Sequence, residues 1–280
     1  MQFRSRTPQP PLDALVENFW AYENYQGEHL HERILPTGTF EIVFNLLEDE
    51  LRIYGPSDAK EIRRFSGAVV SGPYAGSFMS DTREEAAIMG VHFRPGGAFP
   101  ILGIPASEFA NSHVDLAALW GAAASLLREQ LCEASGPAER FSLLEQSLCE
   151  RLRGIKGRSD IRAGLKILIQ SAGQARVRDV ASAIDLSQRR FSELFAKEIG
   201  LAPKTFGRIL RFRNVADASL LATKLDWAQL AIECGYSDQS HLIREFVELS
   251  GVSPTDYFQR HFLLARSGTH VKRHHLPLVN

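Results

Sequence analysis

Two segments in the second half of the chain repeat one another, and this repeat limits the fold more than any other feature of the sequence. The segments "DVASAIDLSQRRFSELFAKEIGLAPKTF" and "QLAIECGYSDQSHLIREFVELSGVSPTDYF" align at an offset of 50 residues at the first matched pair and 51 at the later pairs. A repeat at a fixed spacing indicates one supersecondary unit that is built twice. The matched pairs are Ala181 with Ala231, Phe195 with Phe246, Gly200 with Gly251, Pro203 with Pro254, and Phe206 with Tyr257.

Each copy predicts a helix-turn-helix unit. A small residue on the inner face of a short helix lets a second helix cross it closely, and the matched phenylalanine fills the core between them. Ser187 and Asp238 stand where the second helices begin. The matched glycine ends the second helix, and the matched proline opens the next segment. One such unit is common to many helical hairpins, whereas two in tandem make this interpretation specific.

The chain divides into an acidic and a basic half. Residues 157–280 hold 18 Lys and Arg against 12 Asp and Glu, whereas residues 1–156 hold 14 against 21. The net charge of -1 therefore hides a basic half that carries both repeats. This asymmetry favours a polyanion as the partner of the second half alone, although two folded domains can also differ in charge by chance.

Length and composition are those of a soluble protein with two domains. The chain has 280 residues, of which 44% are hydrophobic and 23% are charged, and it can build two cores. It has no apolar run of the roughly 18 residues that a membrane span requires, and its start lacks the apolar core of a secretory signal. Cys132, Cys149 and Cys234 have no paired metal-ligand spacing and suit a reducing compartment. We therefore expect a cytoplasmic protein without membrane contact, metal or cofactor.

Hydrophobic patterns predict an α+β protein whose first domain, residues 1–110, is rich in β-strands. Short apolar runs alternate there with turn residues and read "ERILP", "TFEIVFNL", "LRIYG", "GAVVSGPY" and "AAIMGVHF". Such runs indicate an antiparallel barrel or sandwich. A second domain, residues 157–265, should be all-α and contain the two helix-turn-helix units. Residues 266–280 should form a loose tail.

Residues 111–156 are expected to form a helical connector between the domains. Apolar residues recur every three or four positions in "DLAALWGAAASLLREQL" and "RFSLLEQSLCERLRG", and "GIKGRSD" (154–160) follows as a linker. The stripes hold Leu116, Leu119, Leu126, Leu127, Leu131, Leu143, Leu144, Leu148 and Leu152. A hairpin of these helices has more apolar surface than it can bury by itself. The surplus must cover either the sheet of the first domain or a second copy, and we favour the second arrangement, a homodimer.

The repeats also carry a family signature. It consists of "LSQRRFSELFAKEIGLAP" in the first unit and "AIECGYSDQSHLIREF" followed by "GVSPTDYF" in the second. On these residues, the segment 160–262 resembles the DNA-binding domain of the AraC/XylS family of bacterial transcription regulators. In that family one long helix joins the two units, here at "PKTFGRILRFRNVADASLL". The sequence departs from the family at Leu242, where an aromatic residue is commoner, and at Val247 and Glu248, where basic residues are usual.

The resemblance implies binding to double-stranded DNA and makes the polar residues of both second helices candidates for reading bases. In such a domain the second helix lies in the major groove, where Gln pairs with adenine, Arg with guanine or phosphate, and Glu with cytosine. The tandem arrangement favours this role over a solvated surface most for Arg189, Gln239 and Arg244. The full set of candidates is Gln188, Arg189, Arg190, Ser192 and Glu193 in the first unit and Gln239, Ser240, His241 and Arg244 in the second.

A pair of histidines in the first domain has the spacing of two metal ligands on one face of a strand. These are His29 and His31. A third ligand is missing from the pattern, because Glu32 points to the other face and Glu41 lies too far along the chain. We therefore expect packed or exposed imidazoles rather than a metal site.

The segment "FRPGGAF" has the glycines of a phosphate-binding loop but not the Lys-Ser/Thr that follows in nucleotide binders. A turn that ends a strand and opens a helix accounts for both glycines. Arg94 in this turn is a candidate either for holding an anionic effector or for a structural salt bridge. The large aromatic residues Trp20, Phe40, Phe44 and Trp120 are expected in the core rather than around a ligand.

The expected function is a transcription regulator that is controlled through its first domain. "ILPTGTFEIVFNL" and "GVHFRPGGAFPILGIPASEF" resemble the amino-terminal domain of one branch of the same family, which implies a small-molecule effector or the pairing of two chains. RNA polymerase is a further candidate partner. Two alternatives stay open: a DNA-binding protein without an effector, whose first half only dimerises, and an enzyme domain fused to a DNA-binding domain. The enzyme is the weaker alternative, because no G-x-S-x-G elbow frames a nucleophile and no cysteine precedes Cys132.

Overall fold

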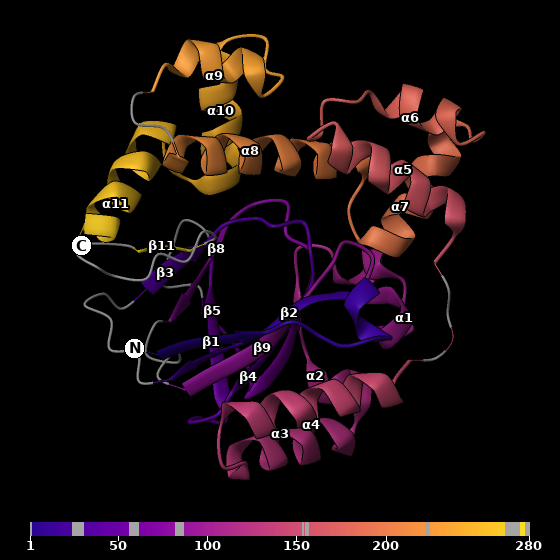
Figure 1. Cartoon of the computed structure of the whole chain (residues 1–280), viewed down its shortest axis with the longest axis vertical. Coiled ribbons are helices and arrows are strands. Elements are labelled where there is room, and N and C mark those ends of the chain that lie inside the picture. The colour runs from indigo at the N-terminus through magenta and orange to yellow at the C-terminus, as the bar shows by residue number, and fades with distance from the viewer. Residues whose placement is uncertain are drawn as a thin grey trace.

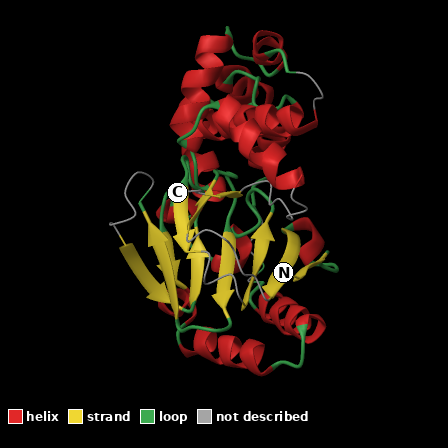
Figure 2. Ribbon diagram, turned by 90° about the vertical axis from the view of Figure 1, so that its left-hand side faces the viewer, coloured by secondary structure: helices red, strands yellow, loops and turns green. Residues whose placement is uncertain are grey.

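The computed structural model describes residues 2–23, 31–55, 62–81, 87–152, 154, 157–221, 225–266 and 275–277. Three layers follow one another along the long axis of the molecule: a helical hairpin, a β-rich layer and a second helical layer (Figure 1, Figure 2). The predicted α+β class is confirmed, because strands dominate the first part of the chain and helices the last part.

Two antiparallel sheets make up the β-rich domain. The six-stranded sheet has the order β1 (Gln2–Arg6), β2 (Val16–Glu23), β9 (Ala87–Phe93), β4 (Glu41–Asn45), β7 (Ala68–Ser71) and β10 (His113–Asp115). The five-stranded sheet has the order β11 (His275–Pro277), β3 (His31–Ile34), β8 (Phe78–Asp81), β5 (Glu50–Tyr54) and β6 (Ile62–Ser66). Within the described ranges no strand belongs to both sheets, so of the two predicted architectures the closed barrel is not formed.

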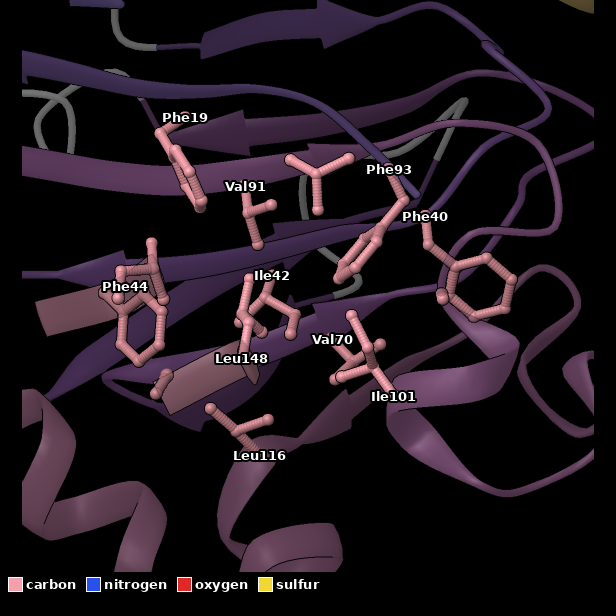
Figure 3. Packing of buried hydrophobic residues seen from close by; sticks show 14 of the residues in the cluster. Phe19, Phe40, Ile42, Phe44, Val70, Val91, Phe93, Ile101, Leu116 and Leu148 are labelled. Atoms are coloured by element: carbon pink, nitrogen blue, oxygen red, sulfur yellow. The ribbon is translucent and has the colours of Figure 1, made fainter. Parts of the chain in front are cut away.

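One face of the six-stranded sheet buries the main hydrophobic core. Phe19, Ile42, Phe44 and Val91 lie on this face and are fully buried (Figure 3), since side chains along a strand point alternately to its two faces. The core is covered by α1 (Phe99–Leu102), α2 (Leu116–Trp120), α3 (Ala122–Glu133) and α4 (Pro137–Glu150). The prediction that Phe40 and Phe44 are core residues is confirmed, while Trp20 and Trp120 are partly buried beside the apolar clusters.

The leucine stripes of the α3–α4 hairpin face the protein's own sheet. Most of them are buried in the main core or packed against it: Leu116, Leu119, Leu127, Leu131, Leu143, Leu144, Leu148 and Leu152. Leu126 remains 56% exposed. This corrects the expectation that a second chain covers the stripes, because the sheet supplies an apolar face within the same chain.

A glycine divides the first connector helix, which the periodicity predicts as continuous. Gly121 adopts φ 59° and ψ -145° and separates α2 from α3. This backbone conformation suits glycine because it has no Cβ. Apolar residues keep the spacing of three or four positions on both sides of Gly121, so this spacing alone did not indicate that the helix is interrupted.

The second helical layer holds both repeats. In the described residues it consists of α5 (Ser159–Gln170), α6 (Val177–Ala183), α7 (Gln188–Ile199), α8 (Pro203–Leu221), α9 (Trp227–Glu233), α10 (Gln239–Ser250) and α11 (Pro254–Arg266). The predicted connecting helix is confirmed as α8. No helix among the described residues is both long enough and apolar enough to cross a membrane. In the predicted linker, α5 already begins at Ser159, and residues 155 and 156 lie outside the described residues.

This helical layer rests on loops of the β-rich domain (Figure 1). At the end of α7, a Cβ built on Gly200 would come within 2.4 Å of Pro73. At α8, a Cβ built on Gly38 would come within 3.2 Å of the Phe206 ring, and Arg213 Nη1 donates to the Thr37 carbonyl at 3.4 Å. The first helix-turn-helix unit and the connecting helix are therefore both held against the β-rich domain.

The end of the chain returns to the β-rich domain. β11 pairs antiparallel with β3, and His275 Nδ1 lies 2.7 Å from Glu32 Oε2. Leu276 is fully buried in the apolar cluster of the second unit. The structure therefore differs from the expected loose tail over residues 275–277, because a buried leucine and a strand edge hold this segment in place.

Candidate nucleic-acid interface

The first helix-turn-helix unit consists of α6 and α7 together with the turn, residues 171–176, that leads into α6. The Ser187 hydroxyl caps α7 by accepting from the Arg190 N–H at 3.2 Å, and Gly200 ends it with φ 98°. Ala181 and Phe195 are buried at the helix crossing. In the first unit the repeated residues thus have the roles predicted for them: a helix cap, a glycine that ends the helix and buried residues at the helix crossing.

The second unit, α9 and α10, repeats this construction. Asp238 Oδ1 accepts from the His241 N–H at 2.8 Å, and Gly251 ends α10 with φ 75°. Hydrogen bonds from the His241 N–H and the Ser237 hydroxyl lower the pKa of the Asp238 carboxyl. Asp238 therefore caps the helix as a carboxylate, which also suits the positive end of the helix dipole.

The same aromatic contact closes the core of each unit. The rings of Phe195 and Phe206 are 5.6 Å apart with an interplanar angle of 62°. The rings of Phe246 and Tyr257 are 5.5 Å apart with an angle of 65°. Both contacts join the second helix of a unit to the helix that follows it, so the two second helices are supported in the same way.

On α7 the predicted polar residues share one outer surface. Gln188, Arg189 and Arg190 are exposed, whereas the Ser192 hydroxyl donates back to the Gln188 carbonyl at 2.9 Å. Glu193 Oε1 accepts from Arg189 Nε at 3.0 Å, and this hydrogen bond lowers the pKa of the Glu193 carboxyl. The Arg189 side chain is 91% exposed, so this pair is weak enough to exchange for a base or a phosphate.

On α10 the predicted residues differ in solvent exposure and in their contacts within the unit. Gln239, Ser240 and Arg244 are exposed. His241 is partly buried, with its ring at 81° and 5.2 Å from the Tyr236 ring and its Nδ1 3.1 Å from Ser237 Oγ. The structure therefore leaves the Gln239 and Arg244 side chains exposed and ties His241 to its own unit.

Two surface grooves lie beside these helices and share two lining residues. The first groove, of about 510 Å³, lies between the first unit and α8 and is lined by Arg176, Arg178, Gln188, Ser192 and Lys204 among others. The second, of about 560 Å³, lies between α8 and α10 and is lined by Lys204, Arg208, Arg211, His241, Arg244, Glu245 and Glu248. Lys204 and Arg211 line both grooves, so cationic side chains lie between α7 and α10 along α8.

Arg176, Arg178 and Lys204 were missed by the sequence analysis. Arg176 is the residue before α6, Arg178 lies in its first turn, and Lys204 follows the proline that opens α8. Their signal is their place in the motif, because the start of the first helix and the start of the connecting helix approach the DNA backbone when a recognition helix enters the groove.

Two carboxylates on α10 offset the charge of the second groove. Glu245 is buried, and its Oε2 accepts from Arg208 Nε at 2.9 Å. Glu248 Oε2 accepts from Arg208 Nη2 at 2.6 Å, and the hydrogen bonds that Arg208 donates to Glu248 and Glu245 raise the pKa of Arg208. The acidic residue that departs from the family pattern at position 248 thus holds α10 to α8 instead of binding phosphate.

The carboxylates and imidazoles of the β-rich domain pair with one another in separate places. His31 packs edge-on against Tyr54 with ring centres 4.6 Å apart, and His29 lies outside the described residues. Glu32 contacts His275, and Glu41 Oε1 lies 2.6 Å from His92 Nδ1. In the described part of the chain no three such side chains come together as metal ligands would.

The turn after β9 serves packing. A Cβ on Gly97 would come within 1.9 Å of the Leu15 carbonyl oxygen, so only glycine fits there. Arg94 Nε donates to the Asp13 carbonyl at 3.0 Å, which is neither of the two roles predicted for it. The prediction that this turn ends a strand and opens a helix is confirmed by β9 and α1.

Comparison with protein families gives two matches along the chain. Residues 4–115 match a family described as a domain of unknown function (DUF6597), and residues 180–260 match a family described as a helix-turn-helix domain. The chain is 29% identical over 164 residues to the probable transcriptional regulator LumQ of Photobacterium leiognathi. That match covers 54% of this chain and 64% of the relative, which is less than two thirds of the relative's length.

Three solved structures that align with the chain are distant from it in sequence. An AraC-type DNA-binding domain protein from Chromobacterium violaceum aligns at 17% identity and a TM-score of 0.34, over 36% of this chain and 90% of that one. ToxT from Vibrio cholerae aligns at 9% identity and a TM-score of 0.45, over 92% of this chain and 98% of that one. ToxT with an unsaturated fatty acid bound aligns at 10% identity and a TM-score of 0.45, over 91% and 94%.

The two family matches fall on the two parts of the molecule described above. The helix-turn-helix match covers both capped recognition helices and the α8 helix between them, and the other match covers most of the β-rich domain. Along the chain, a match to a domain of unknown function thus precedes a match to a helix-turn-helix domain, and the chain is similar over part of its length to a probable transcriptional regulator.

Proposed function

We propose that the protein is a sequence-specific DNA-binding transcription regulator whose α7 and α10 enter successive major grooves of one duplex. The observation that carries this proposal is that two capped helices of the same construction expose amide and guanidinium groups and are joined by the 19-residue helix α8. Helices of this kind read bases with the side chains of their first turns. The similarity to a probable transcriptional regulator supports the same function.

Base reading is assigned to the exposed residues of both helices. Arg189 is suited to guanine and Gln239 to adenine, because each can form two hydrogen bonds with that base in the major groove. Arg244 is suited to guanine or to phosphate. Gln188, Arg190, Ser192, Glu193, Ser240 and His241 complete the two surfaces, and of these Glu193 is suited to the amino group of cytosine.

Phosphate contacts are assigned to the cations at the groove edges. Arg176, Arg178 and Lys204 are exposed beside the first recognition helix. The capped starts of α7 and α10 add backbone N–H groups and a positive dipole end. Phosphate contacts position the domain on the duplex and leave sequence preference to the base contacts.

Control is assigned to the β-rich domain, through a small-molecule effector or through assembly of two chains. The support is the packing of Gly38 on Phe206 and of Gly200 on Pro73, because a change in these loops would reach α7 and α8 directly. A DNA-binding protein whose first half serves only assembly is the alternative. RNA polymerase remains a proposed partner of a regulator bound to its promoter.

Selection of genomic DNA fragments by the purified full chain tests the proposal. We expect a shared sequence motif with two separated elements, and we expect a metabolite extract to change the amount of DNA bound if an effector exists. The double variant Arg189→Ala/Gln239→Ala is the control and should bind DNA without enriching the motif. Equal enrichment by the variant and the natural chain, or no enriched motif at all, would contradict the proposed reading of bases.

A further inference from the structure

The two helix-turn-helix units touch each other directly, in addition to being joined by α8. Gln174, in the turn between α5 and α6, lies against Gly235, in the turn between α9 and α10. A Cβ on Gly235 would come within 2.6 Å of Gln174 Cγ, and the backbone there has φ 80°. Gln174 Nε2 also donates to the Glu233 carbonyl at 3.2 Å.

Arg211 on α8 bridges the units at the same place. Its Nη1 donates to the Gly173 carbonyl of the first unit at 3.0 Å, and its Nη2 donates to Glu245 Oε1 of the second unit at 3.0 Å. The guanidinium carbon lies 5.5 Å from the centre of the Tyr236 ring. One side chain therefore contacts the turn after α5, the recognition helix α10 and the turn that precedes it.

The backbone around Arg211 leaves little room for the units to move apart or together. A Cβ on Gly173 would come within 2.1 Å of the Gly207 carbonyl oxygen, one helical turn before Arg211 on α8. The turn of the first unit is thus packed directly on the connecting helix. Close backbone contact of this kind permits small residues only.

The environment of the bridge makes its loss costly. The Arg211 and Glu245 side chains are 18% and 7% exposed. In a site that excludes most water, a guanidinium and a carboxylate that hydrogen-bond to each other are strongly coupled, and removing Arg211 leaves the buried Glu245 carboxylate paired with Arg208 alone. The bridge thus resists separation of the two units.

We infer that Arg211 is a positioning residue that fixes the distance and angle between α7 and α10, so that the protein reads two DNA elements at one spacing only. This inference rests on the proposed function. One inserted base pair moves an element by about 3.4 Å along the axis and turns it by about 35°, since a helical turn has about 10.5 base pairs. A rigid pair of units cannot follow such a shift, whereas two units that hinge on α8 can.

Arg208 provides a matched control on the same helix. It also hydrogen-bonds to Glu245, through Nε at 2.9 Å, and to Glu248, and within the described part of the chain its hydrogen bonds reach α10 but not the first unit. Loss of Arg208 therefore weakens the hold of α8 on α10 without opening the bridge between units. A second test variant, Gln174→Ala, loosens the contact between units without leaving a buried charge unpaired.

The test is to measure the affinity of the full chain for the DNA site that it selects and for versions of that site with one or two base pairs inserted between the two elements. For the natural chain and Arg208→Ala we expect each single insertion to weaken binding by at least about tenfold. For Arg211→Ala and Gln174→Ala we expect a loss below about threefold, with unchanged base preference within each element. Circular dichroism and thermal unfolding of each variant establish that it is folded.

Three outcomes overturn the inference. Folded Arg211→Ala and Gln174→Ala could keep the spacing penalty of the natural chain, which would show that α8 alone sets the distance. Arg208→Ala could relax the spacing as much as Arg211→Ala, which would place the effect in the Glu245 pair and not in the bridge. A natural chain that selects no site with two elements would instead refute the proposed function, and the premise of the inference with it.

Discussion

Gly38 of the β-rich domain lies against Phe206 of α8, so that a Cβ on the glycine would stand 3.2 Å from the buried ring. Gly38 also has φ 71°, a conformation that side chains with a Cβ rarely adopt. The contact joins the domain of unknown function to the helix that links both helix-turn-helix units. It is one of several places where the β-rich domain contacts the helical layer.

Gly38→Ala is expected to destabilise the folded chain by about 1–2 kcal/mol, because the left-handed backbone disfavours a Cβ by about that amount. Urea denaturation of the full chain measures the loss. Gly76→Ala is the control, since a Cβ at Gly76 meets nothing within 4 Å. An equal stability of the two variants would show that the Gly38 contact does not hold the domains together.

Arg189→Ala and Gln239→Ala should each relax preference at a particular base and cost about 1–3 kcal/mol of binding free energy at that base. The two affected bases should lie roughly one helical turn apart, because the recognition helices are held by one connecting helix. Competition binding against single-base variants of the selected site measures this. Gln170→Ala, exposed on α5 outside both units, is the control; a preference that neither test variant alters would remove α7 and α10 from base reading.

Binding of the full chain to DNA should weaken steeply with added salt, because phosphates recapture the counterions that the protein displaced. Arg176→Ala and Lys204→Ala should weaken binding to all sequences alike and each reduce the slope of log affinity against log salt by about 1. Arg4→Ala, an exposed cation on β1, should leave the slope unchanged. Slopes that are the same for all four proteins would place the phosphate contacts elsewhere.

The partly buried imidazole of His113 should make stability depend on pH. Burial lowers the pKa of His113 from 6.5 to about 3, and the nearby Arg63 charge adds to the effect. Between about pH 6.5 and pH 3 the unfolded chain therefore binds a proton at His113 that the folded chain does not. The free energy of unfolding is unaffected by the titration of His113 above about pH 6.5 and falls progressively as the pH is lowered to about 3. The loss approaches about 1.4 kcal/mol per pH unit within that window.

Comparison of the natural chain with His113→Gln isolates the effect of His113 on the pH dependence of stability, because all other groups titrate in both proteins. The difference in unfolding free energy between them should shrink as the pH falls from 7 to 4. The His113 ring packs 4.8 Å from Phe78 and its Nδ1 lies 2.6 Å from the Tyr74 hydroxyl, so the variant also loses packing at every pH. A difference that does not change with pH would mean that His113 binds its proton as readily in the folded chain as in the unfolded chain.

Pairing of two chains stays a prediction that follows from the resemblance to regulators acting on paired half-sites. Sedimentation of the full chain at micromolar concentration should give a dimer, and a monomer alone would contradict it. Leu126→Glu tests whether the hairpin is part of the contact. Leu126 is the stripe leucine that the sheet leaves 56% exposed, so the charged variant should dissociate a dimer that uses this surface.

The helix-turn-helix units could be predicted in detail because local residues determine them. The caps Ser187 and Asp238, and the glycines and prolines at matched positions, fix where helices begin and end without reference to distant parts of the chain. The connecting helix was predicted from the family resemblance, with the proline after each unit marking where the next segment begins.

Contacts between residues far apart in the chain could not be predicted from the sequence. The bridge from Arg211 to Gly173 and Glu245 joins residues more than 30 positions apart, and no periodic pattern marks it. The strand formed by residues 275–277 depends on an edge of β3 that the first domain supplies. The strand β2 had a usable signal, since "VENFWAYE" mixes polar and apolar residues in near alternation, but its partners β1 and β9 became evident only in the fold.

The claim that this chain reads DNA sequence with its tandem units is tested most directly by equilibrium competition between the selected duplex and a scrambled duplex of the same length and composition. The measurement uses the full chain at one fixed salt concentration, so that the phosphate contribution is equal for both duplexes. We predict that the selected duplex binds at least about 10³-fold more tightly, the lower end of what specific regulators achieve. Equal affinity for the two duplexes would contradict the account.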